Sequence, residues 1–169
     1  AKELLKNKYE VHLGSEKTEV SNIISNYGIV THKLYINRSK IGLIDLIKTT
    51  YSIYRLIKRV DPDIVHFISI KPVILGCIAT KFYQKDLKII TSISGLGFIF
   101  VAKGFIGNLR RFITCFLYKI ALSNKKIKII FQNKTDKNLI NQICNLSSNQ
   151  SIIISGSGVN LNKFKPAKL

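Results

Sequence analysis

Methionine is absent from this sequence, and its first residue is alanine. The chain opens with "AKELLKNKYEV", which reads as the last turns of a helix leading into a strand. We therefore expect that a start residue and a segment before this helix are missing. The rest is rich enough in apolar residues, at 46%, to predict a folded domain with a core.

Cysteine and histidine are scarce, with three of each: Cys77, Cys115, Cys144, His12, His32 and His66. The cysteines lie far apart without any C-x-x-C spacing, and the histidines are scattered. This pattern argues against a disulfide framework and against a metal site, and it favours reduced thiols in the cytoplasm. We expect no cofactor and no metal.

Long apolar runs are also absent, because Lys71, Lys103, Arg110 and Arg111 interrupt the most apolar regions. Nothing reaches the run of about 18 apolar residues that a spanning helix requires. We expect no signal peptide either. These absences predict a cytoplasmic domain.

Acidic residues are few, at 9 against 27 lysines and arginines, for a net charge of +18. Such a balance favours anionic partners such as nucleic acid, anionic lipid or phosphate-bearing substrates. The alternative is that much of the charge reflects the Lys-, Ile- and Asn-rich composition that AT-rich genomes encode. All four glutamates fall within the first 19 residues, and no acid/base pair is visible. The sequence therefore predicts no catalytic residues in this chain.

Strands and helices are predicted to alternate along the whole chain. The patterns predict strands at 9–14, 29–36, 63–69, 87–94, 127–133 and 151–155. They predict helices at 2–7, 18–27, 43–60, 72–83 and 108–123, and one through Leu139, Ile140 and Ile143. Several strands are nearly continuous apolar runs, which is typical of a parallel sheet covered on both faces. The fold class is thus a Rossmann-like, three-layer α/β/α domain with a mainly parallel sheet.

Small hydrogen-bonding residues follow the predicted strands, where ligands bind in open α/β sheets. They include Ser94, Gly95, Gly97 and Asn133, with Lys71 as the one cation. Such groups suit sugar hydroxyls or a phosphate, although they also make good strand-to-helix turns. Gly95-Leu96-Gly97 is no dinucleotide fingerprint, because Phe100 occupies the third glycine position. His66 lies within a strand, which favours a packed core histidine over a catalytic base.

Four segments now point to a family: "DPDIVHFISIKPVILGCIA", "ITSISGLGFIF", "IIFQNKTD" and "IISGSGVNLNKFKP". In this order they resemble the N-terminal half of bacterial family-4 glycosyltransferases of the GT-B fold. The resemblance implies a Rossmann-like lobe at 1–158 that lacks its first strand, and an interlobe linker that begins at 159–169. The donor-binding lobe, with its pair of glutamates, is then absent from this chain.

The resemblance implies a retaining enzyme that moves a sugar from a nucleotide-sugar, usually UDP-linked, to a lipid-linked saccharide. Such enzymes build lipopolysaccharide, capsule or glycan precursors. The lobe here would bind the acceptor through Ser94, Gly95, Gly97, Lys71, His66 and Asn133, while Ser157 and Gly158 would face the donor side of the cleft. Alone it is expected to be inactive. Ser94 stands where relatives carry His or Thr, which leaves a hydrogen-bonding role.

The predicted helix at 108–123 carries an apolar stripe beside Arg110, Arg111 and Lys119. These cations are expected to contact an anionic membrane surface, which would make the protein peripheral on the inner face of the cytoplasmic membrane. The alternative is that the stripe is core and the charges solvate it. Two other readings remain for the whole chain: a basic nucleic-acid-binding domain, and a non-functional remnant of a split gene. Aromatic residues are not interleaved with basic ones on any predicted strand, so we expect no nucleic acid.

Overall fold

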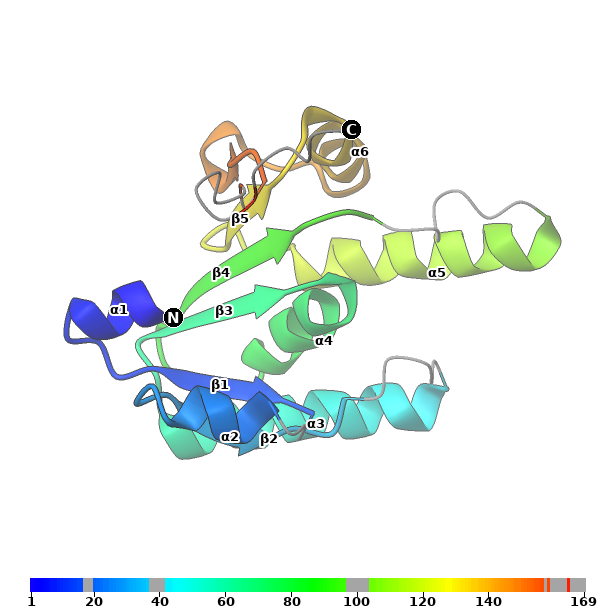
Figure 1. Cartoon of the computed structure of the whole chain (residues 1–169). Coiled ribbons are helices and arrows are strands. Elements are labelled where there is room, and N and C mark those ends of the chain that lie inside the picture. Colours follow the sequence, from blue (N-terminus) through cyan, green and yellow to red (C-terminus); the bar gives the residue numbers. More distant parts are fainter. Residues whose placement is uncertain (17–19, 37–41, 97–103, 157, 159–163, 165–169) are drawn as a thin grey trace, which may run out of the picture. The chain divides into compact units, whose positions relative to one another are not determined.

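The computed structural model describes the chain except residues 17–19, 37–41, 97–103, 157, 159–163 and 165–169. The chain falls into two compact units, one of residues 1–65 and 74–88 and one of residues 66–73 and 89–169 (Figure 1). Each unit is described by itself below. The three boundaries between them fall within β3 (Ile64–Ile68), within α4 (Ile70–Thr80) and within β4 (Lys88–Ile93).

The N-terminal unit contains α1 (Lys2–Lys6), β1 (His12–Ser15), α2 (Val20–Ser25), β2 (Val30–Lys33) and α3 (Leu43–Val60). The two strands pair in parallel, with His12 opposite Val30 and Gly14 opposite His32. Because parallel neighbours need a crossover connection, α2 lies between them in the sequence. The predicted helix at 43–60 is confirmed residue for residue.

One face of α3 packs in the core, and the burial of this face stabilises the helix. Thr49, Ile53 and Ile57 recur every four residues and are buried. The helix ends at Asp61, which takes a left-handed conformation (φ 52°) directly before Pro62. The Asp61 carboxylate accepts hydrogen bonds from the Tyr83 hydroxyl and the Lys85 ammonium group. These bonds lower the pKa of Asp61, with Lys85 the larger cause.

Gly14 allows close packing of β1. The sequence had predicted that the strand ends at this glycine, but it does not. β1 continues through Gly14 to Ser15. A Cβ atom at Gly14 would lie 2.7 Å from Leu34 Cδ1 and 2.8 Å from Leu56 Cδ2. Both leucines belong to this unit, so the glycine allows the strand to approach them.

A sheet with the strand order β3-β4-β5-β6 lies in the C-terminal unit, apart from the first two residues of β3 and the first residue of β4 (Figure 1). The elements of this unit after β3 and α4 are β4 (Lys88–Ile93), α5 (Phe105–Ala121), β5 (Lys128–Phe131), α6 (Lys134–Cys144) and β6 (Ser151–Ile153), with a short 3₁₀ helix at Ser148–Gln150. β5 pairs in parallel with both neighbours, with Ser92 opposite Ile130 and Ile130 opposite Ile152. The core of this unit includes the fully buried Ile93, Tyr118, Ile129, Phe131 and Ile140.

The predicted α/β class with parallel strands is confirmed, but the described strands form two sheets and not one. The other differences are at element ends. α4 begins at Ile70, two residues before the predicted Pro72. Pro72 is tolerated there because the first four N–H groups of a helix have no intrahelical acceptor. α5 begins at Phe105, three residues before its predicted start.

Candidate functional site

The turn from β3 into α4 is short and strained. Ser69 is its single residue and adopts a left-handed conformation, with φ 77°. Its N–H donates to the Ser92 carbonyl oxygen over 3.2 Å, and its own carbonyl oxygen accepts from Val73 N–H over 3.0 Å. Non-glycine residues hold this conformation only where the surroundings fix it, and such residues cluster at functional sites. The turn places the first turn of α4, with the half-buried Lys71, directly after the strand.

His66 lies on β3 and makes a hydrogen bond with a side chain of β4. Its Nε2 is 2.7 Å from Ser92 Oγ. Val65 and Phe67 on either side are buried, whereas His66 is exposed on the other face of the strand. The prediction of a packed core histidine is therefore wrong, because the alternation of the strand turns its side chain away from the core. Partial desolvation lowers the pKa of His66, which favours the neutral imidazole.

Ser94 and Gly95 form the first residues after β4. Ser94 is exposed, as the prediction of a hydrogen-bonding role requires. Gly95 has φ 149°, a conformation that residues with a side chain rarely adopt, yet a Cβ there would meet no atom within 4 Å. The backbone, and not crowding, therefore requires glycine at this position. Gly97 lies outside the described residues.

Asn133 follows β5 and caps α6. Its Oδ1 accepts from the Asp136 N–H over 2.7 Å, and its Nδ2 donates to Asp136 Oδ2 over 2.8 Å. The side chain thereby satisfies one of the free N–H groups at the helix start. A further predicted position, Gly158 after β6, has φ 67°. Ser157 lies outside the described residues.

The chain is matched by the profile of the "Glycosyl transferase 4-like" family over residues 1–133. It belongs to this glycosyltransferase family. Ser69, Lys71, His66, Ser94, Gly95 and Asn133 all fall within the matched range or at its end. Family membership confirms the resemblance that the four segments indicated.

Among curated proteins, this glycosyltransferase chain is similar to a Campylobacter jejuni enzyme. That enzyme is named N,N'-diacetylbacillosaminyl-diphospho-undecaprenol alpha-1,3-N-acetylgalactosaminyltransferase, and the two are 24% identical over 165 residues. The match covers 98% of this chain and 43% of the relative. The chain therefore spans less than half the length of the relative it matches.

Solved glycosyltransferases share the fold. A glycosyltransferase from Rickettsia africae has a TM-score of 0.63 at 20% identity, over 100% of this chain and 40% of that protein. Acinetobacter baumannii MurG has a TM-score of 0.54 at 12% identity, over 96% and 41%. At these identities the similarities show the fold alone, and they confirm the predicted class, a lobe of the GT-B fold.

An exposed apolar face runs along α5 of this member of the glycosyltransferase family. Six large side chains are exposed along the helix: Phe105, Ile106, Leu109, Phe112, Ile113 and Phe116. Phe105 is 85% exposed and Phe112 is 71% exposed. The buried residues of α5 are instead Gly107, Tyr118 and Ala121. In this structure the predicted apolar stripe thus lies largely on the surface, with Arg110, Arg111 and Lys119 exposed on the same helix.

Two kinds of feature are absent from the described residues, a metal-ligating cluster and a membrane-spanning helix. No group of three metal-ligating side chains gathers anywhere in the described parts of this glycosyltransferase. None of the helices described for it is both long enough and apolar enough to cross a bilayer.

Sequence reasoning missed two features of the site, the hydrogen bond between His66 and Ser92 and the left-handed conformation of Ser69. Ser69 and Ser92 both stand at the ends of predicted strands, but the sequence pattern did not show that Ser92 is the partner of His66. Each residue alternates with buried positions on its own strand, but the contact also requires that the two strands are neighbours, which the sequence pattern does not give. The left-handed conformation of Ser69 was missed because no sequence pattern marks a serine with positive φ.

Proposed function

We propose that this chain is the acceptor-binding lobe of a retaining glycosyltransferase that acts on a lipid-linked saccharide. The observation that carries the proposal is the family match over residues 1–133. The Campylobacter relative supports the acceptor class, because its name specifies a saccharide on diphospho-undecaprenol. The donor is a nucleotide-sugar, UDP-linked, and it binds to a second lobe beyond this chain.

The candidate residues other than Asn133, which caps α6, have the following roles in this proposal. The Ser94 hydroxyl and the Gly95 backbone contact acceptor hydroxyls at the end of β4, where Ser94 is exposed and a Cβ on Gly95 would meet open space. The hydrogen bond between His66 on β3 and Ser92 on β4 lies on the same strand, β4. Lys71 contacts the acceptor diphosphate from the first turn of α4, where helix N–H groups also favour an anion. Gly158 would face the donor side of the cleft. The predicted roles of Gly97 toward the acceptor and of Ser157 toward the donor stay predictions, because both residues lie outside the described residues.

Substitution of Ser94 tests the acceptor site. We expect Ser94→Ala to weaken binding of a water-soluble polyprenyl-diphosphate saccharide about fivefold, the effect of one lost hydrogen bond. Isothermal titration calorimetry measures the affinity. The matched control is Ser148→Ala, since Ser148 is equally exposed but lies in the 3₁₀ helix. Equal weakening by both substitutions, or by neither, would count against the assigned site.

A membrane-surface role follows for α5. An amphipathic helix with aromatic residues on one side and basic residues beside them lies in the bilayer interface. The exposed Phe105, Phe112 and Phe116 fit this arrangement. Near an anionic leaflet each of Arg110, Arg111 and Lys119 adds about 1 kcal/mol. In this proposal the protein lies at the inner face of the cytoplasmic membrane, beside its lipid-linked acceptor.

Liposome flotation tests this role. We expect the chain to float with vesicles that contain phosphatidylglycerol and to float less with pure phosphatidylcholine. Phe112→Ser combined with Phe116→Ser should abolish flotation because the inserted apolar area is lost. Phe82→Ser is the control, since Phe82 is 67% exposed but lies outside α5. Equal recovery on both vesicle types, or an equal loss with Phe82→Ser, would contradict the proposal.

A further inference from the structure

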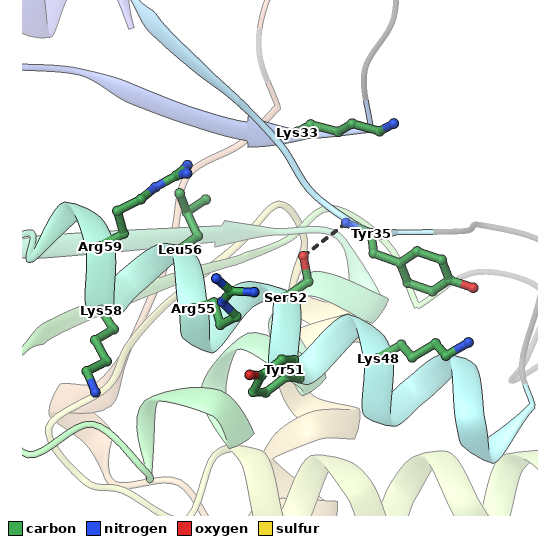
Figure 2. A pocket seen from close by; sticks show the side chains of 9 residues that line it. All are labelled: Lys33, Tyr35, Lys48, Tyr51, Ser52, Arg55, Leu56, Lys58 and Arg59. Atoms are coloured by element: carbon green, nitrogen blue, oxygen red, sulfur yellow. Dashed lines mark hydrogen bonds between the residues drawn. The ribbon is translucent and has the colours of Figure 1, made fainter.

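A groove of about 680 Å³ lies in the N-terminal unit between the end of β2 and α3 (Figure 2). Five of the residues that line it are cationic, and the others are two tyrosines, a serine and a leucine. They are Lys33, Tyr35, Lys48, Tyr51, Ser52, Arg55, Leu56, Lys58 and Arg59. None of the lining residues is acidic.

The periodicity of α3 gathers the cations on one side. Lys48, Arg55 and Arg59 are separated by seven and four residues, which are whole turns of a helix to within a fraction of a residue. The buried face of the same helix carries Thr49, Ile53 and Ile57. Lys33 approaches from the end of β2, so the groove is cationic along both walls (Figure 2).

Carboxylates within the described residues do not neutralise this charge. Lys33, Lys48, Arg55 and Lys58 form no salt bridge with any described residue. Asp45, from the first turn of α3, instead accepts a hydrogen bond from the Tyr35 hydroxyl over 2.6 Å. That bond raises the pKa of Tyr35, so the phenol stays neutral. Like charges gathered in this way repel one another until an anion binds between them.

The polar and aromatic groups of the groove suit more than a bare ion. Ser52 Oγ accepts the Tyr35 N–H over 3.1 Å, which leaves the hydroxyl hydrogen of Ser52 able to donate to an anion. Lys48 lies 6.0 Å from the Tyr35 ring centroid and Arg55 lies 5.9 Å from that of Tyr51. These rings hold the cations at the groove and offer apolar surface beside them.

We propose that the groove between β2 and α3 binds a phosphate-bearing ligand, most favourably a diphosphate. Lys33, Lys48 and Arg55 contact the phosphate oxygens, and Ser52 donates a hydrogen bond. The rings of Tyr35 and Tyr51 cover the uncharged part to which the phosphate is attached. Cationic side chains with several N–H donors are the groups that bind phosphate most strongly. This binding does not depend on the glycosyltransferase function proposed above.

Titration with inorganic pyrophosphate at constant ionic strength tests the site. We expect saturable binding and a rise in Tm, because a ligand that binds only the folded state stabilises it. Lys48→Gln and Arg55→Gln should each weaken binding about tenfold, the effect of a lost charge-assisted hydrogen bond. The control variants, Lys125→Gln and Lys134→Gln, remove the same charge from exposed positions outside the groove and should leave the affinity unchanged. Circular dichroism of each variant tests whether it is folded.

Two further ligands separate the sources of the phosphate. Farnesyl diphosphate bound more tightly than pyrophosphate would assign the groove to a lipid-linked diphosphate, and equal affinity would assign it to the phosphate group alone. The proposal is wrong if pyrophosphate shows no saturable binding, or if groove and control variants lose affinity equally. It is also wrong if a random oligonucleotide binds while both diphosphates do not.

Discussion

Asn133 shows how a single residue can match the site and still serve the fold. It follows β5 and was predicted to bind the acceptor. In the structure its side chain makes two hydrogen bonds with Asp136 in the first turn of α6. Both of its polar groups are thus engaged in capping, and the cap positions α6 after the strand.

Replacement of Asn133 separates capping from acceptor binding. We expect Asn133→Ala to lower the free energy of unfolding by about 1 kcal/mol, as for other lost N-caps. Asn133→Ser should retain most of the stability, because a serine hydroxyl can accept the same N–H. Chemical denaturation measures both. If Asn133→Ser were as stable as the natural protein but had lost acceptor affinity, a direct role in binding would be established.

What the sequence can and cannot predict differs by residue. Ser94, exposed after β4, was identifiable because strand ends are visible in the pattern of apolar residues. The contact between His66 and Ser92 was not, because it depends on which strands are neighbours and how they are aligned. The packing of Gly14 against Leu34 and Leu56 was hidden for the same reason. Residue types can be read locally, whereas their partners come from the tertiary fold.

At the scale of elements, β1, β2 and α3 are joined by a chain of hydrogen bonds with one direction. Arg59 can only donate, so His32 Nδ1, at 2.8 Å, accepts. His32 Nε2–H then donates to His12 Nδ1 over 2.8 Å. His12 Nε2–H in turn faces Glu10 Oε1, also at 2.8 Å. The His32 imidazole is neutral in this arrangement, and a proton added to it would break the chain of hydrogen bonds.

The stability of the protein should therefore fall in mild acid. Burial, followed by Arg59 and then His12, lowers the pKa of His32. The folded state thus holds fewer protons on His32 than the unfolded chain, whose imidazole titrates near pH ~6.5. This contribution to stability is fully present above that pH and is lost as the pH falls through it. Urea denaturation at pH 7.5 and 5.5 should show a lower midpoint in acid.

His32→Gln provides the matched variant, since glutamine does not titrate. We expect it to have a smaller difference between the two pH values than the natural protein. The lowered pKa of His66 also makes the protein less stable in acid. A His66→Gln variant therefore measures the part of the pH dependence that comes from His66. An unchanged pH difference in His32→Gln would show that the histidine pair does not control the response.

α5 shows what the spacing of apolar residues can and cannot predict about a helix. The spacing of Leu109, Phe112 and Phe116 predicted a helix with an apolar stripe, and α5 has both. Periodicity says that apolar residues share a face, but it does not say what covers that face. The structure buries Gly107, Tyr118 and Ala121 and leaves the aromatic residues exposed. This exposure is the reason why we place α5 on the membrane surface.

At the scale of the whole molecule, the order of elements was readable because apolar strands and amphipathic helices alternate clearly. The division into two sheets was not, because strand pairing depends on residues distant in the sequence. The net charge of +18 likewise said nothing about location. In the structure, part of this positive charge lies in the groove lined by Lys33, Lys48 and Arg55. Another part lies on the exposed cations of α5.

The most direct test of the account compares acceptor and donor binding by the same chain. Calorimetric titration with a polyprenyl-diphosphate saccharide and, separately, with UDP-N-acetylgalactosamine measures both affinities. The account predicts saturable binding of the acceptor, no binding of the nucleotide-sugar, and no release of UDP. Tight binding of the nucleotide-sugar without the acceptor, or UDP release at an enzymatic rate, would contradict the assignment of this chain as an acceptor-binding lobe.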